Sequence, residues 1–159
     1  MTVVSNASPL CYLVLIGHAE LLPKLYKNIH TTRTVITELC HPDAPEAVRS
    51  WARSPPVWLH LDADPSEPDE TLTRLHAGER SAIWLAESLK ADVVLLDEAA
   101  ARSAALRRGL RVSGLLAVVR DGGAAGLLDV ASAIDRLRQT NFRVTPALLR
   151  SILPDTHES

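Results

Sequence analysis

Five side chains with oxygen donors occupy positions that suit a cation site. Asn6 follows the first predicted strand, Asp97 and Glu98 follow a central one, and Glu38 and Glu79 lie in or at the start of predicted helices. Mg²⁺ and Mn²⁺ bind carboxylate, carbonyl and water oxygens, at about 2.0–2.2 Å. If the chain brings these side chains together, their chemistry predicts a site for one of these hard cations.

Each of these residues also has a plain structural interpretation, and the spacing does not decide between the two. Glu79 in a first helical turn is stabilised by the helix dipole by about 0.3–1 kcal/mol without any other role. Glu38 fits the solvated face of a helix. Asp97 and Glu98 fit the end of a strand and the start of a helix, and Asn6 fits a turn.

The element that positions Asn6 is a strand predicted at residues 2–6, followed at once by a helix. Ser8 is the expected N-cap and Pro9 the expected first helical residue, because proline has no amide hydrogen to lose there. Gly17 is the expected end of this helix.

The element that positions Asp97 is the continuous apolar run at residues 93–96, which is typical of a strand buried on both faces of a parallel sheet. Other strands are predicted at 29–31, 57–61 and 111–113. Helices are predicted at 19–26, 34–40, 45–53, 70–76, from Gly78 onward, and at 98–108, 115–120, 127–139 and 145–153, with a break at Gly122 and Gly123. This alternation predicts an α/β fold with helices on both faces of a parallel sheet and ligands beyond the carboxyl ends of its strands.

Length and composition limit the class of protein. The chain has 159 residues, 47% of them hydrophobic, and a formal net charge of −2. We expect one domain over residues 1–153 with a short tail at 154–159. No apolar run reaches the roughly 18 residues of a membrane helix, the N-terminus lacks signal-peptide features, and two cysteines fit a reducing compartment, so we expect a cytoplasmic protein without membrane contact.

Several common motifs are absent from the sequence. No G-x-G-x-x-G follows the first strand, and neither G-x-x-x-x-G-K-[ST] nor G-x-S-x-G occurs. Cys40 and His41 lack the neighbours that a zinc site needs. The sequence therefore disfavours dinucleotide binding, P-loop chemistry, serine hydrolysis and structural zinc.

Five short segments, taken in order, resemble the PIN-domain family and, more narrowly, its branch of VapC-like toxin ribonucleases. The segments are VVSNASPL at 3–10, VITE at 35–38, AGERSAI at 77–83, VLLDE at 94–98 with AAR at 100–102, and VSGLL at 112–116. Together they span nearly the whole chain. Each is weak alone, and their order and spacing carry the resemblance.

The resemblance implies a three-layer α/β/α fold with a central, mostly parallel sheet and a Mg²⁺ or Mn²⁺ site that hydrolyses phosphodiester bonds in RNA. The family's four acidic positions fall on Asn6, Glu38, Glu79 and Asp97, and its serine or threonine position falls on Ser8. The resemblance thus makes Glu38, Glu79 and Asp97 the catalytic residues, with Glu98 as a further metal ligand.

Two positions depart from the family pattern. The first acidic position usually holds aspartate, and Asn6 offers a neutral carbonyl oxygen instead, which removes one negative charge from the site. Leu115 stands where related sequences often have threonine, so a hydroxyl near the site is lost.

Basic residues concentrate in the second part of the chain. Residues 1–99 carry 8 basic and 14 acidic side chains, and residues 100–159 carry 9 and 5. All nine are arginines, whose planar donors suit phosphate oxygens, although solvated helix faces would explain them equally well. We expect Ser8, Arg102 and Ser113 to contact substrate, with Arg102 nearest the acidic site.

The function expected from these observations is a metal-dependent endoribonuclease, within this branch the toxin of a toxin–antitoxin pair. Its partners would be RNA, an antitoxin protein and a second copy of the chain. The alternative is a PIN fold weakened in catalysis by Asn6, acting as an RNA-binding or protein-interaction module. A phosphoacceptor receiver is disfavoured, because the chain lacks both the acidic pair after the first strand and a late lysine.

Overall fold

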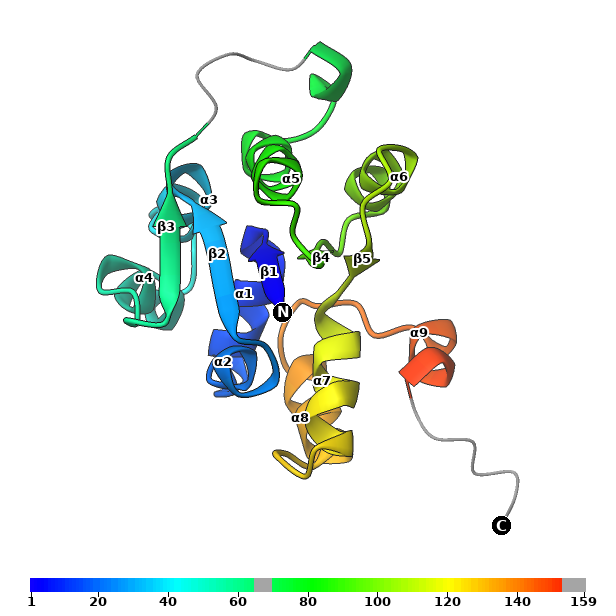
Figure 1. The fold of residues 1–159 in the computed structure, drawn as a ribbon. Coiled ribbons are helices and arrows are strands. Elements are labelled where there is room, and N and C mark those ends of the chain that lie inside the picture. Colours follow the sequence, from blue (N-terminus) through cyan, green and yellow to red (C-terminus); the bar gives the residue numbers. More distant parts are fainter. Residues whose placement is uncertain (65–69, 153–159) are drawn as a thin grey trace.

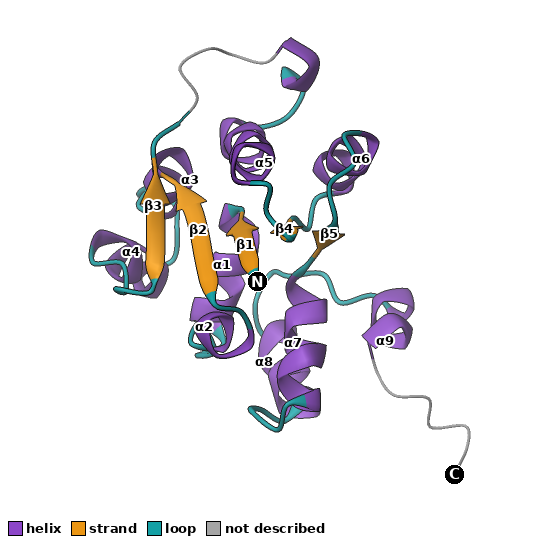
Figure 2. Ribbon diagram, in the orientation of Figure 1, coloured by secondary structure: helices purple, strands orange, loops and turns teal. Residues whose placement is uncertain are grey.

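A five-stranded parallel sheet forms the centre of the protein. The computed structural model describes residues 1–64 and 70–152. The strands are β1 (Thr2–Ser5), β2 (Asn28–Thr32), β3 (Leu59–Asp62), β4 (Val93–Leu95) and β5 (Val112–Ser113), arranged in the order β3-β2-β1-β4-β5. Every neighbouring pair is parallel, with Val3 opposite Ile29 on one side and Val93 on the other (Figures 1 and 2).

Helices cover both faces of this sheet, which confirms the predicted three-layer α/β/α fold. The helices and the 3-10 turn are α1 (Ala7–Leu15), α2 (Leu21–Leu25), α3 (Arg33–Leu39), α4 (Glu46–Arg53), η1 (Glu70–Leu72), α5 (Ala77–Leu89), α6 (Ala99–Arg107), α7 (Leu115–Ala124), α8 (Val130–Arg138) and α9 (Pro146–Ile152). Figure 1 shows α5 and α6 on one side of the sheet and α1, α2, α7 and α8 on the other. None of the helices within residues 1–64 and 70–152 has the length and apolarity needed to cross a bilayer.

The alternation of side chains along the central strands explains the two helical layers. Val3 and Leu95 point into a core shared with α1, α3, α7 and α8. Val4, Val94 and Leu96 point into a second core, shared with α5 and α6. Because both faces of β4 are buried, its sequence continues as an uninterrupted apolar run over residues 93–96, as predicted, and β1 buries Val3 on one face and Val4 on the other.

The strand order places a topological switch point between β1 and β4. From β1 the chain continues outward through β2 and β3, whereas β4 and β5 lie on its other side. Ligands of open parallel sheets bind beyond the carboxyl ends of the strands at such a point. Asn6 and Asp97 follow these two central strands, and the amide of Asn6 donates to the carbonyl of Leu95 at 3.1 Å.

The first helix begins earlier than the sequence predicts. Asn6, not Ser8, is the N-cap of α1, and its backbone is extended. Ser8 and Pro9 therefore lie in the first turn, where proline is tolerated because its missing amide would have no intrahelical acceptor. The prediction of Ser8 as N-cap was wrong, and the correction leaves its hydroxyl available for another contact.

The predicted break at Gly122 and Gly123 was also wrong, because α7 continues through both residues to Ala124. A β-carbon on Gly122 would lie 3.0 Å from Leu21 of α2, and one on Gly123 would overlap the side chain of Val130. The two glycines allow α7 to pack closely against its neighbours, which is a reason for glycine that does not require a break.

Candidate functional site

Asp97 is held in a fixed orientation just beyond the carboxyl end of β4. Its Oδ1 accepts a hydrogen bond from the amide of Leu115 at 2.9 Å, and its Oδ2 accepts one from the hydroxyl of Ser8 at 3.4 Å. These two donors come from α7 and α1, so the carboxylate is positioned by elements from both halves of the chain. Ser8 reaches it because α1 starts at Ala7.

The environment of Asp97 raises the pKa of its carboxyl group above the ordinary value. Burial is the main cause, and Glu98 adds to it, while the amide of Leu115, the guanidinium of Arg102 and the hydroxyl of Ser8 oppose it. Burial disfavours the charged form of an acid, and a nearby cation favours it. Asp97 is therefore a carboxylate whose charge a bound cation would further stabilise.

Arg102 packs against Asp97 across Gly114. Its Nη1 donates to the carbonyl of Leu96 at 2.8 Å. A β-carbon on Gly114 would lie 2.6 Å from Oδ1 of Asp97 and 3.0 Å from Nη1 of Arg102. Glycine at this position is thus required for the close approach of the arginine, the carboxylate and the start of α7.

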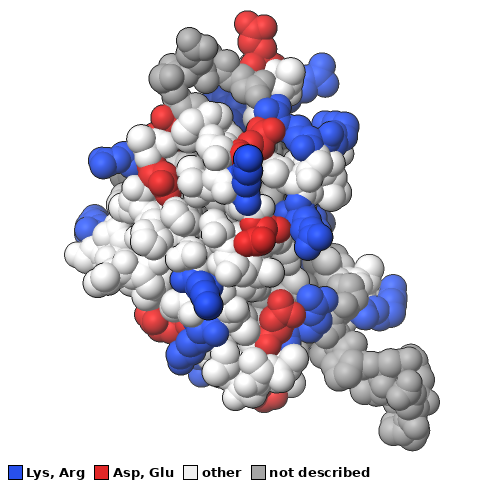
Figure 3. Space-filling view, in the orientation of Figure 1, with Lys and Arg blue, Asp and Glu red and all other residues white. Residues whose placement is uncertain are grey.

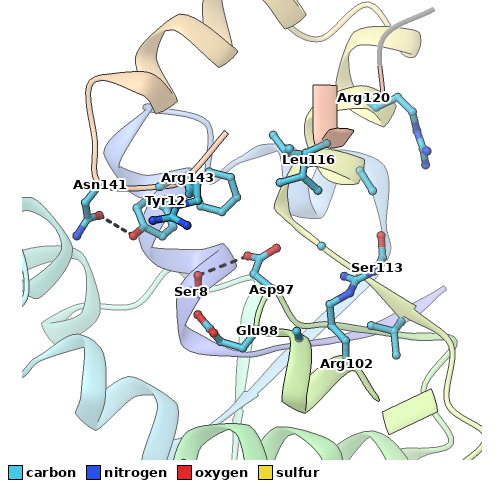
Figure 4. A pocket seen from close by; sticks show the side chains of 16 residues that line it. Ser8, Tyr12, Asp97, Glu98, Arg102, Ser113, Leu116, Arg120, Asn141 and Arg143 are labelled. Atoms are coloured by element: carbon cyan, nitrogen blue, oxygen red, sulfur yellow. Dashed lines mark hydrogen bonds between the residues drawn. The ribbon is translucent and has the colours of Figure 1, made fainter. Parts of the chain in front are cut away.

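A cavity of about 890 Å³ opens over Asp97 (Figure 4). Its walls come from α1, the β4–α6 connection, β5, α7 and the segment that leads into α9. The lining residues that carry charge or a hydrogen-bonding side chain are Ser8, Tyr12, Asp97, Glu98, Arg102, Ser113, Arg120, Asn141 and Arg143. A polar cavity of this size at a switch point is typical of a ligand site.

Five of the predicted site residues meet in this cavity, and three do not line it. Ser8, Asp97, Glu98, Arg102 and Ser113 are in its wall. Asn6, Glu38 and Glu79 belong to the neighbouring strand end and to the junction between α3 and α5.

Glu38 and Glu79 both bind the N-terminus of α5. Oε1 of Glu38 accepts from the amide of Gly78 at 2.9 Å, and Oε1 of the buried Glu79 accepts from the amide of His76 at 3.0 Å. A β-carbon on Gly78 would lie 2.5 Å from Oε2 of Glu38, so glycine makes this approach possible. Both carboxylates are favoured by the positive end of the helix dipole.

Asn6 carries a buried polar atom that no described residue satisfies. Its side chain is 5% exposed, and its Oδ1 has no hydrogen-bond partner within residues 1–64 and 70–152. Buried carbonyl oxygens are normally paired, and an unpaired one needs an explanation, of which a bound ion or water is one. The position of Asn6 beside β4 makes this oxygen a candidate cation ligand.

These donors fit Mg²⁺ or Mn²⁺ in chemistry, although they do not form a closed cage. Among the described residues, no group of three or more His, Cys, Asp or Glu side chains is placed to hold an ion. Mg²⁺ usually keeps several waters and is bound through one or two carboxylates together with substrate phosphates. The chemistry of Asp97 and of the unpaired oxygen of Asn6 suits such an open site.

The surface charge around the fold is mixed. Figure 3 shows Lys and Arg side chains interspersed with Asp and Glu on the face that it draws. On α7, for example, Arg120 forms an ion pair of 3.2 Å with Asp121. Because charges of both signs are mixed on this face, the net charge says little about ligand binding, and the individual arginines that line the cavity say more.

Sequence reasoning missed most of the cavity wall that comes from the C-terminal part. Tyr12 of α1, Asn141 and Phe142 were not predicted, and Arg120 and Arg143 were counted only among the nine arginines after residue 99. Tyr12 and Asn141 are 129 positions apart, so no local pattern connects them. The run of arginines after residue 99 was the available signal.

The fold and the site define a parallel α/β protein with an acidic, arginine-lined site at its switch point. The model of the family DUF3368, described as a PIN domain, matches residues 2–158. The chain belongs to this PIN-domain family. PIN domains are generally nucleases that bind RNA and depend on divalent metals.

A solved structure supports the fold. The chain is similar to a PilT N-terminus domain protein from the hyperthermophilic archaeon Sulfolobus solfataricus P2, with a TM-score of 0.54 and 12% identity over 91% of this chain and 100% of the other. No curated protein matches the sequence.

Proposed function

We propose that this protein is a Mg²⁺- or Mn²⁺-dependent endoribonuclease that hydrolyses phosphodiester bonds in RNA. The observation that carries the proposal is Asp97, a carboxylate fixed by two hydrogen bonds in a polar cavity at the switch point. Membership in a family of nucleases supplies the class of reaction.

The ion would be held by oxygens of Asn6, Glu38, Glu79, Asp97 and Glu98, directly or through water. When bound, the ion acidifies a water molecule and neutralises charge on the attacked phosphate. A carboxylate of Glu38, Glu79 or Asp97 would serve as the base that takes up the proton of the attacking water.

The remaining side chains of the cavity would act on the substrate. Arg102 has one nitrogen engaged with the carbonyl of Leu96, so its guanidinium is fixed and presents its other donors to phosphate. Ser8 orients Asp97 and, with Ser113, offers a hydroxyl to the RNA backbone.

The test is cleavage of a mixed single-stranded RNA pool in Mn²⁺, in EDTA, and by the variant Asp97→Asn. We expect cleavage by the wild type in Mn²⁺ alone and at least a hundredfold loss in Asp97→Asn, since an amide is a neutral and weaker ligand than a carboxylate and cannot act as a base. Asp92→Asn is the matched control, because Asp92 precedes β4 at its opposite end and accepts from the amide of Thr2. The nuclease proposal would be contradicted by an absence of cleavage in Mn²⁺. It would also be contradicted by cleavage that persists both in EDTA and in the variant Asp97→Asn.

The alternative is a weakened PIN fold that binds RNA or a protein without cleaving. The neutral side chain of Asn6 favours this alternative, because it removes one negative charge from the cation site. Retention of the RNA pool by the wild type without any cleavage in Mn²⁺ would identify it.

We further propose that the protein is a toxin of the VapC-like branch that acts in the cytoplasm as a homodimer and is neutralised by an antitoxin. The resemblance in the five sequence segments supports this narrower role. A small neighbouring gene whose product co-purifies with the chain is the expected finding, and sedimentation of the purified protein as a monomer would contradict the dimer.

A further inference from the structure

The segment between α8 and α9 crosses the edge of the cavity and is attached to α1. The hydroxyl of Tyr12 donates to Oδ1 of Asn141 at 2.6 Å. The ring of Tyr12 also contacts Phe142 edge to face, with 5.0 Å between the ring centroids. One side chain of α1 thus holds two consecutive residues of the segment, and the next residue, Arg143, lines the cavity.

The three arginines of the cavity lie on opposite sides of Asp97. Figure 4 shows Arg143 beside Tyr12 on one side, and Arg102 and Arg120 toward β5 and α7 on the other. A phosphodiester chain that passes over Asp97 would therefore meet a guanidinium before and after the acidic centre.

These arginines differ in whether their guanidinium groups already bind other groups of the protein. Arg102 donates to the carbonyl of Leu96, and Arg120 is paired with Asp121. Arg143 is exposed and forms no ion pair with any residue in 1–64 or 70–152. On the α1 side of the cavity, it is the arginine with a whole guanidinium to offer a ligand.

We propose that Arg143 binds a backbone phosphate next to the scissile one and that Tyr12 is the positioning residue that holds Arg143 over the cavity. This inference rests on the proposed function for the identity of the substrate as RNA. It assigns to the segment after α8 a part in substrate binding that the five family-like segments do not include.

Binding of a fluorescent single-stranded RNA in EDTA tests the role of Arg143 apart from catalysis. We expect Arg143→Ala to weaken binding about tenfold, to a similar degree for different sequences, because phosphate contacts carry no base information. A plot of the logarithm of the binding constant against the logarithm of the salt concentration should become less steep by about 0.7, the value for one phosphate contact on a single strand. Arg138→Ala is the control, since Arg138 is exposed on α8, has the same charge and does not line the cavity.

The role of Tyr12 is tested by Tyr12→Phe, which removes the hydrogen bond to Asn141 and keeps the ring. We expect this variant to weaken binding a fewfold and to add little when combined with Arg143→Ala, because both changes affect the same contact. Additive effects in the double variant would overturn the positioning role. Tighter binding by Tyr12→Phe would overturn it too and would make the segment a cover that excludes RNA.

The two proposals fail in different ways. If the wild type cleaves RNA in Mn²⁺ but Arg143→Ala keeps the salt slope of Arg138→Ala, the nuclease proposal stands and the phosphate contact is rejected. If the wild type binds RNA with the expected loss in Arg143→Ala but never cleaves, the contact is supported and the nuclease is rejected. No binding by the wild type rejects the contact.

Discussion

Asp97 and Asn6 follow adjacent strands, and they differ in whether their side-chain oxygens have hydrogen-bond partners in the protein. Asp97 has a backbone amide, a hydroxyl and a guanidinium close by, so its orientation is set before any ligand arrives. The Oδ1 of Asn6 is buried without a partner among the described residues. In the proposed cation site, the oriented carboxylate and the unsatisfied oxygen would take an ion that keeps part of its water shell.

The unsatisfied oxygen of Asn6 leads to a prediction for Asn6→Asp. Without metal, the new carboxylate is buried and unpaired, and we expect the free energy of unfolding to fall by about 1–3 kcal/mol. With Mn²⁺, the added charge should tighten binding at least tenfold and restore the stability. Calorimetric titration with Mn²⁺ and thermal unfolding with and without the ion measure both effects.

The control for this variant is Asn28→Asp, which adds the same charge at the exposed, opposite end of the neighbouring strand β2. It should leave the Mn²⁺ affinity at the wild-type value. An equal affinity in Asn6→Asp would show that position 6 is not a ligand position.

The residues of the site that the sequence could predict are those next to a strong local pattern. Asp97 and Glu98 stand out because they end an apolar run, and Arg102 lies one helical turn beyond. Tyr12 and Asn141 could not be found in this way, because their contact depends on how α1 and the α8–α9 segment meet in three dimensions. The grouping of Asn6, Glu38 and Glu79 around a common ion stays a prediction.

At the scale of elements, α3 and α5 are joined by a buried polar network. The hydroxyl of Ser81 donates to the carbonyl of Gly78 at 2.8 Å and lies 2.7 Å from the hydroxyl of Thr32. Thr32 caps α3 by accepting from the amide of Val35. The network therefore fixes the start of both helices, and with them the two carboxylates that meet at the first turn of α5.

We predict that Ser81→Ala destabilises the fold by about 1–2 kcal/mol. Loss of the hydroxyl leaves buried polar groups of Thr32 and Gly78 short of a partner, which costs about 1–3 kcal/mol, and the better helix propensity of alanine offsets a part of this. Urea unfolding measures the change. Ser103→Ala on the exposed face of α6 should change stability by less than about 0.5 kcal/mol, and equal changes in the two variants would contradict the role of the network.

Two predictions about helices were wrong for the same physical reason. The start of α1 and the continuity of α7 were predicted from residue preferences at Ser8, Gly122 and Gly123. The structure instead follows the packing: Ser8 turns to Asp97, and the glycines admit Leu21 and Val130. Helix propensity is a weak determinant, which tertiary contacts override.

For the whole molecule, alternation of strands and helices was enough to predict the α/β class, because a helix between two strands typically serves as the crossover that parallel strands need. The strand order was not predictable in this way. The order puts β1 at the centre with β4 beside it, where Val3, Val4 and Leu95 are fully buried, and it places the switch point between these two strands.

Packing between distant elements also predicts how the whole fold responds to alkaline pH. Tyr26 ends α2, and its hydroxyl donates to Asp121 of α7 at 3.4 Å. Burial and the negative charge of Asp121 raise the pKa of Tyr26 to about 12, while Arg120 opposes the rise. In the unfolded chain the pKa of tyrosine is about 10.

A raised pKa means that the folded state keeps its phenol proton where the unfolded state loses it. The contribution of Tyr26 to stability is therefore complete below pH 10 and is lost as the pH rises from 10 to 12. We predict that the free energy of unfolding falls more steeply over this interval in the wild type than in Tyr26→Phe, as measured by urea unfolding. Parallel curves for the two proteins would contradict this assignment.

The chain has two tyrosines, which makes an independent check possible. In Tyr12→Phe, Tyr26 is the one phenol left, and an ultraviolet titration of the folded protein reads its ionisation directly. Because α2 and α7 pack together in the core that also supports the site, we expect this titration to end in unfolding as Asp121 and the phenolate come to repel each other. A reversible ionisation near pH 10 in the folded protein would show that Tyr26 is open to solvent and that the α2–α7 contact does not couple alkaline pH to the fold.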